Sequence, residues 1–170
     1  MFTDHTNPKE VLETIQSIKP ASPRYHGRLG YVNRRWYKNE RFSGQMEYAE
    51  YVNNCVVGFM IEKVEAVKNI DEICKIPGVD FIQFGPADFS LNSGFDYKKN
   101  EENVRSIEKH VIETCLKYGV SPRVEINHAK EAKKYIDMGV KHFALGTELH
   151  ILRDFYNDEG TQLNDLLRVK

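Results

Sequence analysis

The chain has 170 residues, of which 41% are hydrophobic and 29% are charged, as in a single globular domain rather than a disordered segment. Its 24 basic and 25 acidic residues leave a formal net charge of -1, so no overall field attracts nucleic acid or an anionic membrane surface. The cysteines, Cys55, Cys74 and Cys115, are widely spaced, which favours buried thiols in a reducing compartment over disulfides or a zinc cluster. Because neither a signal peptide nor a membrane span is evident, we expect a cytoplasmic protein.

The predicted elements alternate between helices and apolar strands. Asn7 followed by Pro8 is a typical helix start, and each apolar run is too short for a helix and is bounded by polar residues. Such alternation implies parallel strands joined by right-handed crossovers, in an open doubly wound sheet or in a barrel. In chain order, we predict a helix over 8–19, a loop over 21–45, a helix over 46–54, a strand over 55–62, a helix over 63–76, a strand over 79–85, a helix over 101–118, a strand over 120–126, a helix over 129–139, a strand over 141–146 and a helical stretch over 165–170.

Three predicted strand ends carry polar groups: Glu62, Asp88 and the segment 146–148. Parallel sheets bind ligands beyond the carboxyl ends of their strands, so Glu62 and Asp88 are expected at one rim if their strands are neighbours. One or two carboxylates with substrate oxygens and water suit magnesium or manganese. The spacing equally fits two acids that begin helices and interact favourably with the helix dipoles, and segment 146–148 fits either an anion site or a tight turn.

The segment FMIEKVEAVKNIDEICKIPGVDFIQFGPADFSLNSG closely resembles the centre of the class II pyruvate-type aldolases, the family of 2,4-dihydroxyhept-2-ene-1,7-dioate aldolase, which also includes citrate-lyase-like members of the phosphoenolpyruvate/pyruvate barrel superfamily. Weaker similarity extends to PRYHGRLG and to KEAKKYIDMGVKHFALGTE. The resemblance covers most of the chain from about residue 8 onward.

This resemblance implies a TIM-type (β/α) barrel and a lyase that cleaves 4-hydroxy-2-oxo acids to pyruvate and an aldehyde. It makes Glu62 and Asp88 the ligands of a divalent metal (Mg, Mn or Co). It also places the substrate carboxylate at Gly85, Pro86, Ala87 and Asp88, where backbone amides that open a helix point toward an anion. Metal polarisation of the 2-oxo group would stabilise the enolate.

The chain is shorter than the barrel that the resemblance implies. A complete barrel has eight strand-helix units and typically about 250 residues, whereas residues 1–170 form one predicted domain with about four units, corresponding to the family's C-terminal half. The family's N-terminal strands, with its catalytic histidine and an arginine, have no counterpart, and Met60 replaces a glutamine.

Three interpretations follow from this incomplete barrel. The first is half of a barrel completed by a second copy or by a partner subunit, the second is a fragment of a longer enzyme, and the third is a non-catalytic metal- and oxo-acid-binding or assembly module. We favour an aldolase whose small-molecule substrate is a 2-oxo acid, with the binding module as the alternative.

Other polar residues are weaker candidates. His128 follows the strand 120–126 and is the best candidate in the chain for a general base. His26, Arg28, Arg34 and Arg35 are alternatives that a glycine-rich loop could bring to the site. The run RRWYKNERF suggests stacking on nucleic-acid bases, but without a wider basic patch it is better explained by packing, so neither nucleic acid nor membrane is an expected partner. The C-terminal residues 157–170 are predicted to form an acidic loop and a short amphipathic helix.

Overall fold

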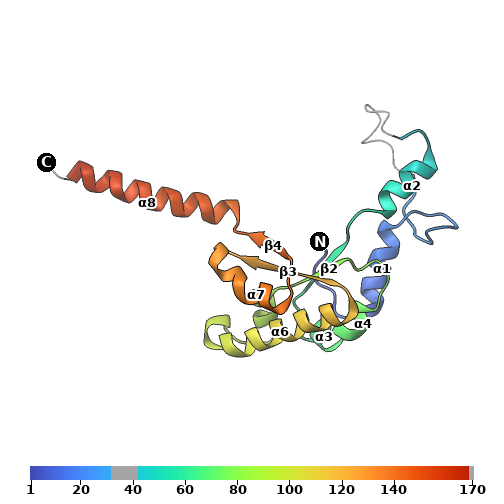
Figure 1. The fold of residues 1–170 in the computed structure, drawn as a ribbon, viewed down its shortest axis with the longest axis horizontal. Coiled ribbons are helices and arrows are strands. Elements are labelled where there is room, and N and C mark those ends of the chain that lie inside the picture. Colours follow the sequence, from blue (N-terminus) through green and yellow to red (C-terminus); the bar gives the residue numbers. More distant parts are fainter. Residues whose placement is uncertain (32–41, 169–170) are drawn as a thin grey trace. The chain divides into compact units, whose positions relative to one another are not determined.

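The computed structural model describes residues 1–31 and 42–168 (Figure 1). Its internal contacts divide the chain into two compact units, Met1–Pro122 and Arg123–Lys170. No helix among the described residues is both long and apolar enough to cross a membrane.

The first unit contains two parallel strands and most of the helices. β1 pairs with β2 in parallel, with Ile61 opposite Phe84 at their carboxyl ends. The elements are α1 (Pro8–Ile18), α2 (Gln45–Asn53), β1 (Gly58–Ile61), α3 (Val64–Lys68), α4 (Ile70–Cys74), β2 (Phe81–Phe84), α5 (Pro86–Asn92), the 3₁₀ turn η1 (Tyr97–Lys99) and α6 (Glu101–Tyr118).

Local sequence signals account for several helix ends. The Asn7 side chain accepts a hydrogen bond from the Glu10 amide, and Pro8 occupies the first helical position of α1, where its missing N–H costs nothing. α6 ends at Gly119 in the left-handed conformation, as glycine commonly does after a helix. The predicted boundaries of α6 are confirmed, and α1 ends one residue before the predicted end, with Lys19 as its C-cap.

One apolar cluster holds the first unit together. Phe59 and Ile61 of β1 are fully buried, as are Val11 of α1 and Ile73 of α4. Because side chains alternate along a strand, Met60 and Glu62 belong to the opposite face of β1 from Phe59 and Ile61. The cluster therefore leaves Glu62 pointing away from the helix layer.

The amino-terminal segment forms an additional strand-like pairing that the sequence did not reveal. The Phe2 amide donates to the Gly58 carbonyl at 2.9 Å, and the Met60 amide donates to the Phe2 carbonyl at 2.8 Å. This parallel bridge between Phe2 and Phe59 carries residues 3–5 past the carboxyl end of β1.

The second unit has a small core and a long exposed helix. The Val124, Ile126, Tyr135 and Val140 side chains are buried, and the strands β3 and β4 pair in parallel. The elements are β3 (Ser121–Ile126), whose first two residues belong to the first unit, the 3₁₀ turn η2 (Ala129–Glu131), α7 (Ala132–Met138), β4 (His142–Leu145) and α8 (Glu148–Arg168).

The structure corrects three details. The single helix expected over 63–76 is two short helices separated at Asn69. The loop expected from 157 to 164 is helical, because α8 runs without interruption from Glu148 to Arg168. The apolar residues on either side of the acidic stretch, Tyr156 and Leu163, are seven positions apart, which is about two helical turns. Cys55 is exposed rather than buried, whereas Cys74 and Cys115 are buried as expected.

Candidate functional site

Glu62 directly follows β1, as expected for a residue that a parallel sheet presents at its rim. Its side chain is only 5% exposed, although buried carboxylates are costly unless they have polar or charged partners. One such partner is the Asp4 amide, which donates to Glu62 Oε1 at 2.9 Å. Glu62 therefore lies at the end of β1 with its carboxylate held by a hydrogen bond. It is not the first residue of α3, because Lys63 is the N-cap of that helix.

Gly85 brings the end of β2 against the end of β1. Its amide donates to the Ile61 carbonyl at 2.9 Å. A Cβ atom at Gly85 would lie 3.1 Å from Glu62 Cβ and 3.0 Å from Met60 Sδ, so any larger residue would push on the carboxylate-bearing turn. This close approach places Glu62 beside the Gly85–Asp88 turn.

Asp88 lies in the first turn of α5, which begins at Pro86. Asp88 and Ala87 are exposed, while Gly85 is buried. A second hydrogen bond links α5 to the segment that follows β1: Asn92 Oδ1 at the end of α5 accepts from the Val64 amide at 2.9 Å. Asp88 thus lies in the first turn of a helix and also exposes its carboxylate at the strand end.

A lysine and a third carboxylate lie beside this pair. Lys63 Nζ is 2.6 Å from Asp4 Oδ1. The hydrogen bond to Asp4 raises the pKa of Lys63 above its ordinary value, and the negative charges of Asp4, Glu62 and Asp88 act in the same direction. In return, the hydrogen bond from Lys63 lowers the pKa of Asp4. All four groups therefore share one electrostatic environment.

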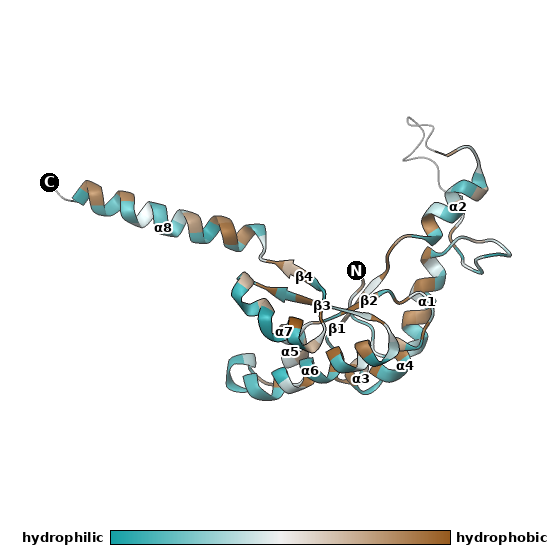
Figure 2. Cartoon of the chain, viewed as in Figure 1, coloured by the Kyte–Doolittle hydropathy of each residue, from teal (hydrophilic) through white to brown (hydrophobic). Residues whose placement is uncertain are grey.

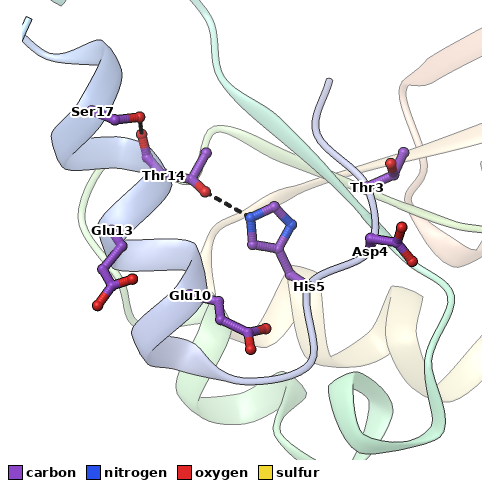
Figure 3. Close-up of a pocket in the computed structure, with 7 residues that line it drawn as sticks. All are labelled: Thr3, Asp4, His5, Glu10, Glu13, Thr14 and Ser17. Atoms are coloured by element: carbon purple, nitrogen blue, oxygen red, sulfur yellow. Dashed lines mark hydrogen bonds between the residues drawn. The ribbon is translucent and has the colours of Figure 1, made fainter.

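A hollow of about 380 Å³ lies between the amino-terminal segment and α1 (Figure 3). Inside it His5 Nε2 is 2.7 Å from Thr14 Oγ1, and the His5 ring stands edge-on to Phe59 at 5.0 Å. The buried His5 Nδ1 atom has no hydrogen-bond partner within residues 1–31 and 42–168. Because Phe59 and Glu62 lie on opposite faces of β1, His5 belongs to the helix side, opposite to the face that carries Glu62.

The other predicted residues are placed as follows. His128 is exposed at the N-cap of η2, in the second unit. His26 and Arg28 are exposed in the loop after α1, where Arg28 donates to the Glu13 carbonyl at 2.9 Å. Arg34 and Arg35 lie outside the described residues, as does most of the run RRWYKNERF.

The carboxylates suit a hard divalent cation by their chemistry. Within the part of the chain that the structure describes, no three or more His, Cys, Asp or Glu side chains form a cluster able to hold a metal. Glu62 and Asp88 alone would supply two oxygen donors and leave the remaining positions to water and substrate, as magnesium and manganese tolerate. The residues present therefore fit a substrate-binding metal rather than an enclosed structural one.

Comparison with known proteins shows which family this sequence belongs to. A model of the HpcH/HpaI aldolase/citrate lyase family matches residues 6–154. The chain belongs to this family. The 4-hydroxy-2-oxo-heptane-1,7-dioate aldolase of Escherichia coli (strain ATCC 8739) is 30% identical over 108 residues, which are 62% of this chain and 41% of that protein. The Klebsiella pneumoniae protein of the same name is 28% identical over 114 residues, 66% of this chain and 43% of that one. The chain thus spans about two fifths of the length of these curated relatives.

Solved structures of other proteins superpose on nearly the whole chain. An HpcH/HpaI family protein from Burkholderia cenocepacia J2315 gives a TM-score of 0.82 at 18% identity, over 96% of this chain and 64% of its own. The citrate synthase SbnG gives 0.76 at 25% identity, over 96% of this chain and 62% of its own. The predicted α/β fold with parallel strands is confirmed, and its extent corresponds to part of the barrel expected for the HpcH/HpaI family.

Asp4 and Lys63 are the neighbours of the site that sequence reasoning missed. The hydrogen bond from Asp4 to Glu62 joins residues 58 positions apart, and nothing in MFTDH marks a strand. Lys63 follows Glu62 directly in the sequence, but nothing in the sequence shows which way its side chain points. Its ion pair with Asp4 places the ammonium group beside the carboxylates of the site.

We predict that Gly85→Ala destabilises the protein by about 1–3 kcal/mol, the usual cost of overpacking, because the new methyl group would meet Met60 and Glu62. Urea unfolding followed by circular dichroism measures the change. Gly30→Ala is the matched control, since no described atom lies within 4 Å of a Cβ atom there. Equal stability of the two variants would contradict the close approach of the two strand ends.

Proposed function

We propose that this HpcH/HpaI family protein is a metal-dependent carbon–carbon lyase that cleaves 4-hydroxy-2-oxo acids to pyruvate and an aldehyde. The observation that carries the proposal is the packing of buried Glu62 against the Gly85–Asp88 turn at the carboxyl ends of two parallel strands. The names of the two curated relatives described above, both 4-hydroxy-2-oxo-heptane-1,7-dioate aldolases, support the substrate class.

In this proposal Glu62 and Asp88 hold the cation. Mg²⁺, Mn²⁺ or Co²⁺ bound there would supply Lewis-acid stabilisation of negative charge on the 2-oxo oxygen. The Asp4 amide fixes Glu62 Oε1, and Gly85 gives a substrate carboxylate access to the backbone of Pro86–Asp88 because it has no side chain. The ordered turn thus binds and orients the part of the substrate that becomes pyruvate.

The general base is a separate part of the proposal. His128 remains the candidate within this chain, and a group from another half of the barrel is the alternative. His5 lies on the helix side of β1, and His26 is exposed in the loop after α1. The structure therefore favours neither as the base.

We predict that the protein releases pyruvate from 4-hydroxy-2-oxo-heptane-1,7-dioate only when Mn²⁺, Mg²⁺ or Co²⁺ is added. Glu62→Gln and Asp88→Asn should each lower kcat/KM by about 100-fold or more, because the metal supplies several kcal/mol of transition-state stabilisation. A coupled pyruvate assay measures this. Glu65→Gln, on the exposed surface of α3 where Glu65 pairs with Lys68 at 2.7 Å, is the control and should retain full activity.

The alternative function has a distinct signature in the same experiment. If the folded protein showed no turnover but bound oxalate in a metal-dependent way, the lyase proposal would be wrong and the protein would be a metal- and oxo-acid-binding module. Metal affinity unchanged in both carboxylate variants would overturn the site under either function.

We also propose that the protein associates with a second copy or with a partner subunit that completes the barrel. Support comes from α8, which has no buried residue among those described. Hydrophobic residues recur along it (Figure 2) at a spacing typical of a helix that buries one face. Leu149, Leu152, Tyr156, Leu163 and Leu166 are each between 53% and 74% exposed. Such an apolar stripe favours contact with another protein surface.

We predict a mass above that of the 19.8 kDa chain when the purified protein is measured by light scattering. Leu152→Glu combined with Leu163→Glu should lower the mass, because charges would replace two apolar contacts of α8. Gln162→Glu on the same helix should leave it unchanged. A wild-type monomer, or identical masses for all three proteins, would contradict association through α8.

A further inference from the structure

We propose that Asp4 is a positioning residue of the metal site: its carboxylate holds the Lys63 ammonium group so that Glu62 and Asp88 remain available to a divalent cation. This inference rests on the proposed role of Glu62 and Asp88 as metal ligands. It adds two residues, Asp4 and Lys63, from segments that lie far apart in the sequence.

The contacts of Asp4 point to both of its functions. Its amide donates to Glu62 Oε1 at 2.9 Å, and its carboxylate lies 2.6 Å from Lys63 Nζ. Asp4 has a φ of 70°, in the left-handed region that Asp tolerates better than most residues. One residue therefore orients a ligand through its backbone and binds a neighbouring cation through its side chain.

The Lys63 ammonium group competes with a metal ion for the carboxylates of Glu62 and Asp88. It follows Glu62 in the chain, and the charges of Glu62 and Asp88 both act on it. A lysine ammonium group on its flexible four-carbon chain is a competitor for the same carboxylates that would bind a metal. Its side chain is 25% exposed, against 77% for Asp4, so Lys63 is held near the protein surface rather than extended into solvent.

The charge balance supports the same conclusion. Asp4, Glu62 and Asp88 carry three formal negative charges and Lys63 carries one positive charge, so the group has a net formal charge of -3 + 1 = -2. This matches one divalent cation. Without the Asp4 charge the net value is -1, and the ammonium group is free to pair with a metal ligand, so both changes weaken metal binding.

The test is a double-mutant cycle on Mn²⁺ affinity, measured from the free Mn²⁺ signal in electron paramagnetic resonance titrations of the whole chain. Asp4→Asn should weaken Mn²⁺ binding about tenfold, a 1.4 kcal/mol change. Lys63→Met should bind Mn²⁺ at least as tightly as the wild type. The double variant should recover the affinity that Asp4→Asn loses and bind Mn²⁺ to within about twofold of the wild type, since the competing cation is gone and the net charge is again -2.

A matched pair elsewhere controls for general charge effects. Asp96 and Lys99 form an ion pair of 2.7 Å with both side chains exposed, and Asp96→Asn there should leave Mn²⁺ affinity unchanged. Circular dichroism melting checks that each variant is folded. If Asp4→Asn did not fold, Lys63→Met alone decides, because weaker Mn²⁺ binding by that variant would overturn the inference.

The outcomes separate this inference from the proposed function. Wild-type Mn²⁺ binding that depends on Glu62 but is unaffected by Asp4→Asn would overturn the role of Asp4 and leave the metal site intact. Weakened binding in Asp4→Asn without recovery in the double variant would overturn the role assigned to Lys63. Wild-type binding insensitive to Glu62→Gln would overturn the metal site and, with it, the positioning role of Asp4.

Discussion

The close approach of Gly85 to Glu62 is the constraint on which the site depends. Parallel pairing puts the ends of β1 and β2 side by side, but only a residue without a side chain lets the second strand end turn directly against Glu62 and Met60. The hydrogen bonds from Gly85 to Ile61 and from Val64 to Asn92 then hold the two turns together. In the proposed metal site, this pair of turns would offer two carboxylates to one ion without ordering them at the moment of binding.

The amino-terminal segment also helps to hold the end of β1 in place. Its bridge to β1 fixes the backbone of Phe2, and two residues later Asp4 contacts both Glu62 and Lys63. His5 then packs against Phe59 and Thr14. Adjacent residues thus serve opposite faces of β1, which explains how a short segment can support both the apolar cluster and the polar rim.

Sequence reasoning succeeded where the signal is local. Asn7 with Pro8 marked α1, the predicted range 101–118 matched α6, and the run GPAD located the turn after β2. The bridge between Phe2 and Phe59 was missed because backbone pairing at long range leaves no pattern in MFTDH, and Asp4 was missed with it. The length of α8 was underestimated because Asn157, Asp158 and Gly160 have low helix propensity and no apolar residue lies between Tyr156 and Leu163.

The central claim is that the ends of β1 and β2 bind a divalent cation, and Mn²⁺ titration of ¹⁵N-labelled protein followed by nuclear magnetic resonance tests it most directly. The account predicts that paramagnetic broadening first removes the amide signals of Lys63, Gly85 and Asp88, and that Glu62→Gln abolishes this selectivity. Broadening that begins instead around the exposed Asp96–Lys99 pair, or that is the same in the Glu62→Gln variant, would contradict it.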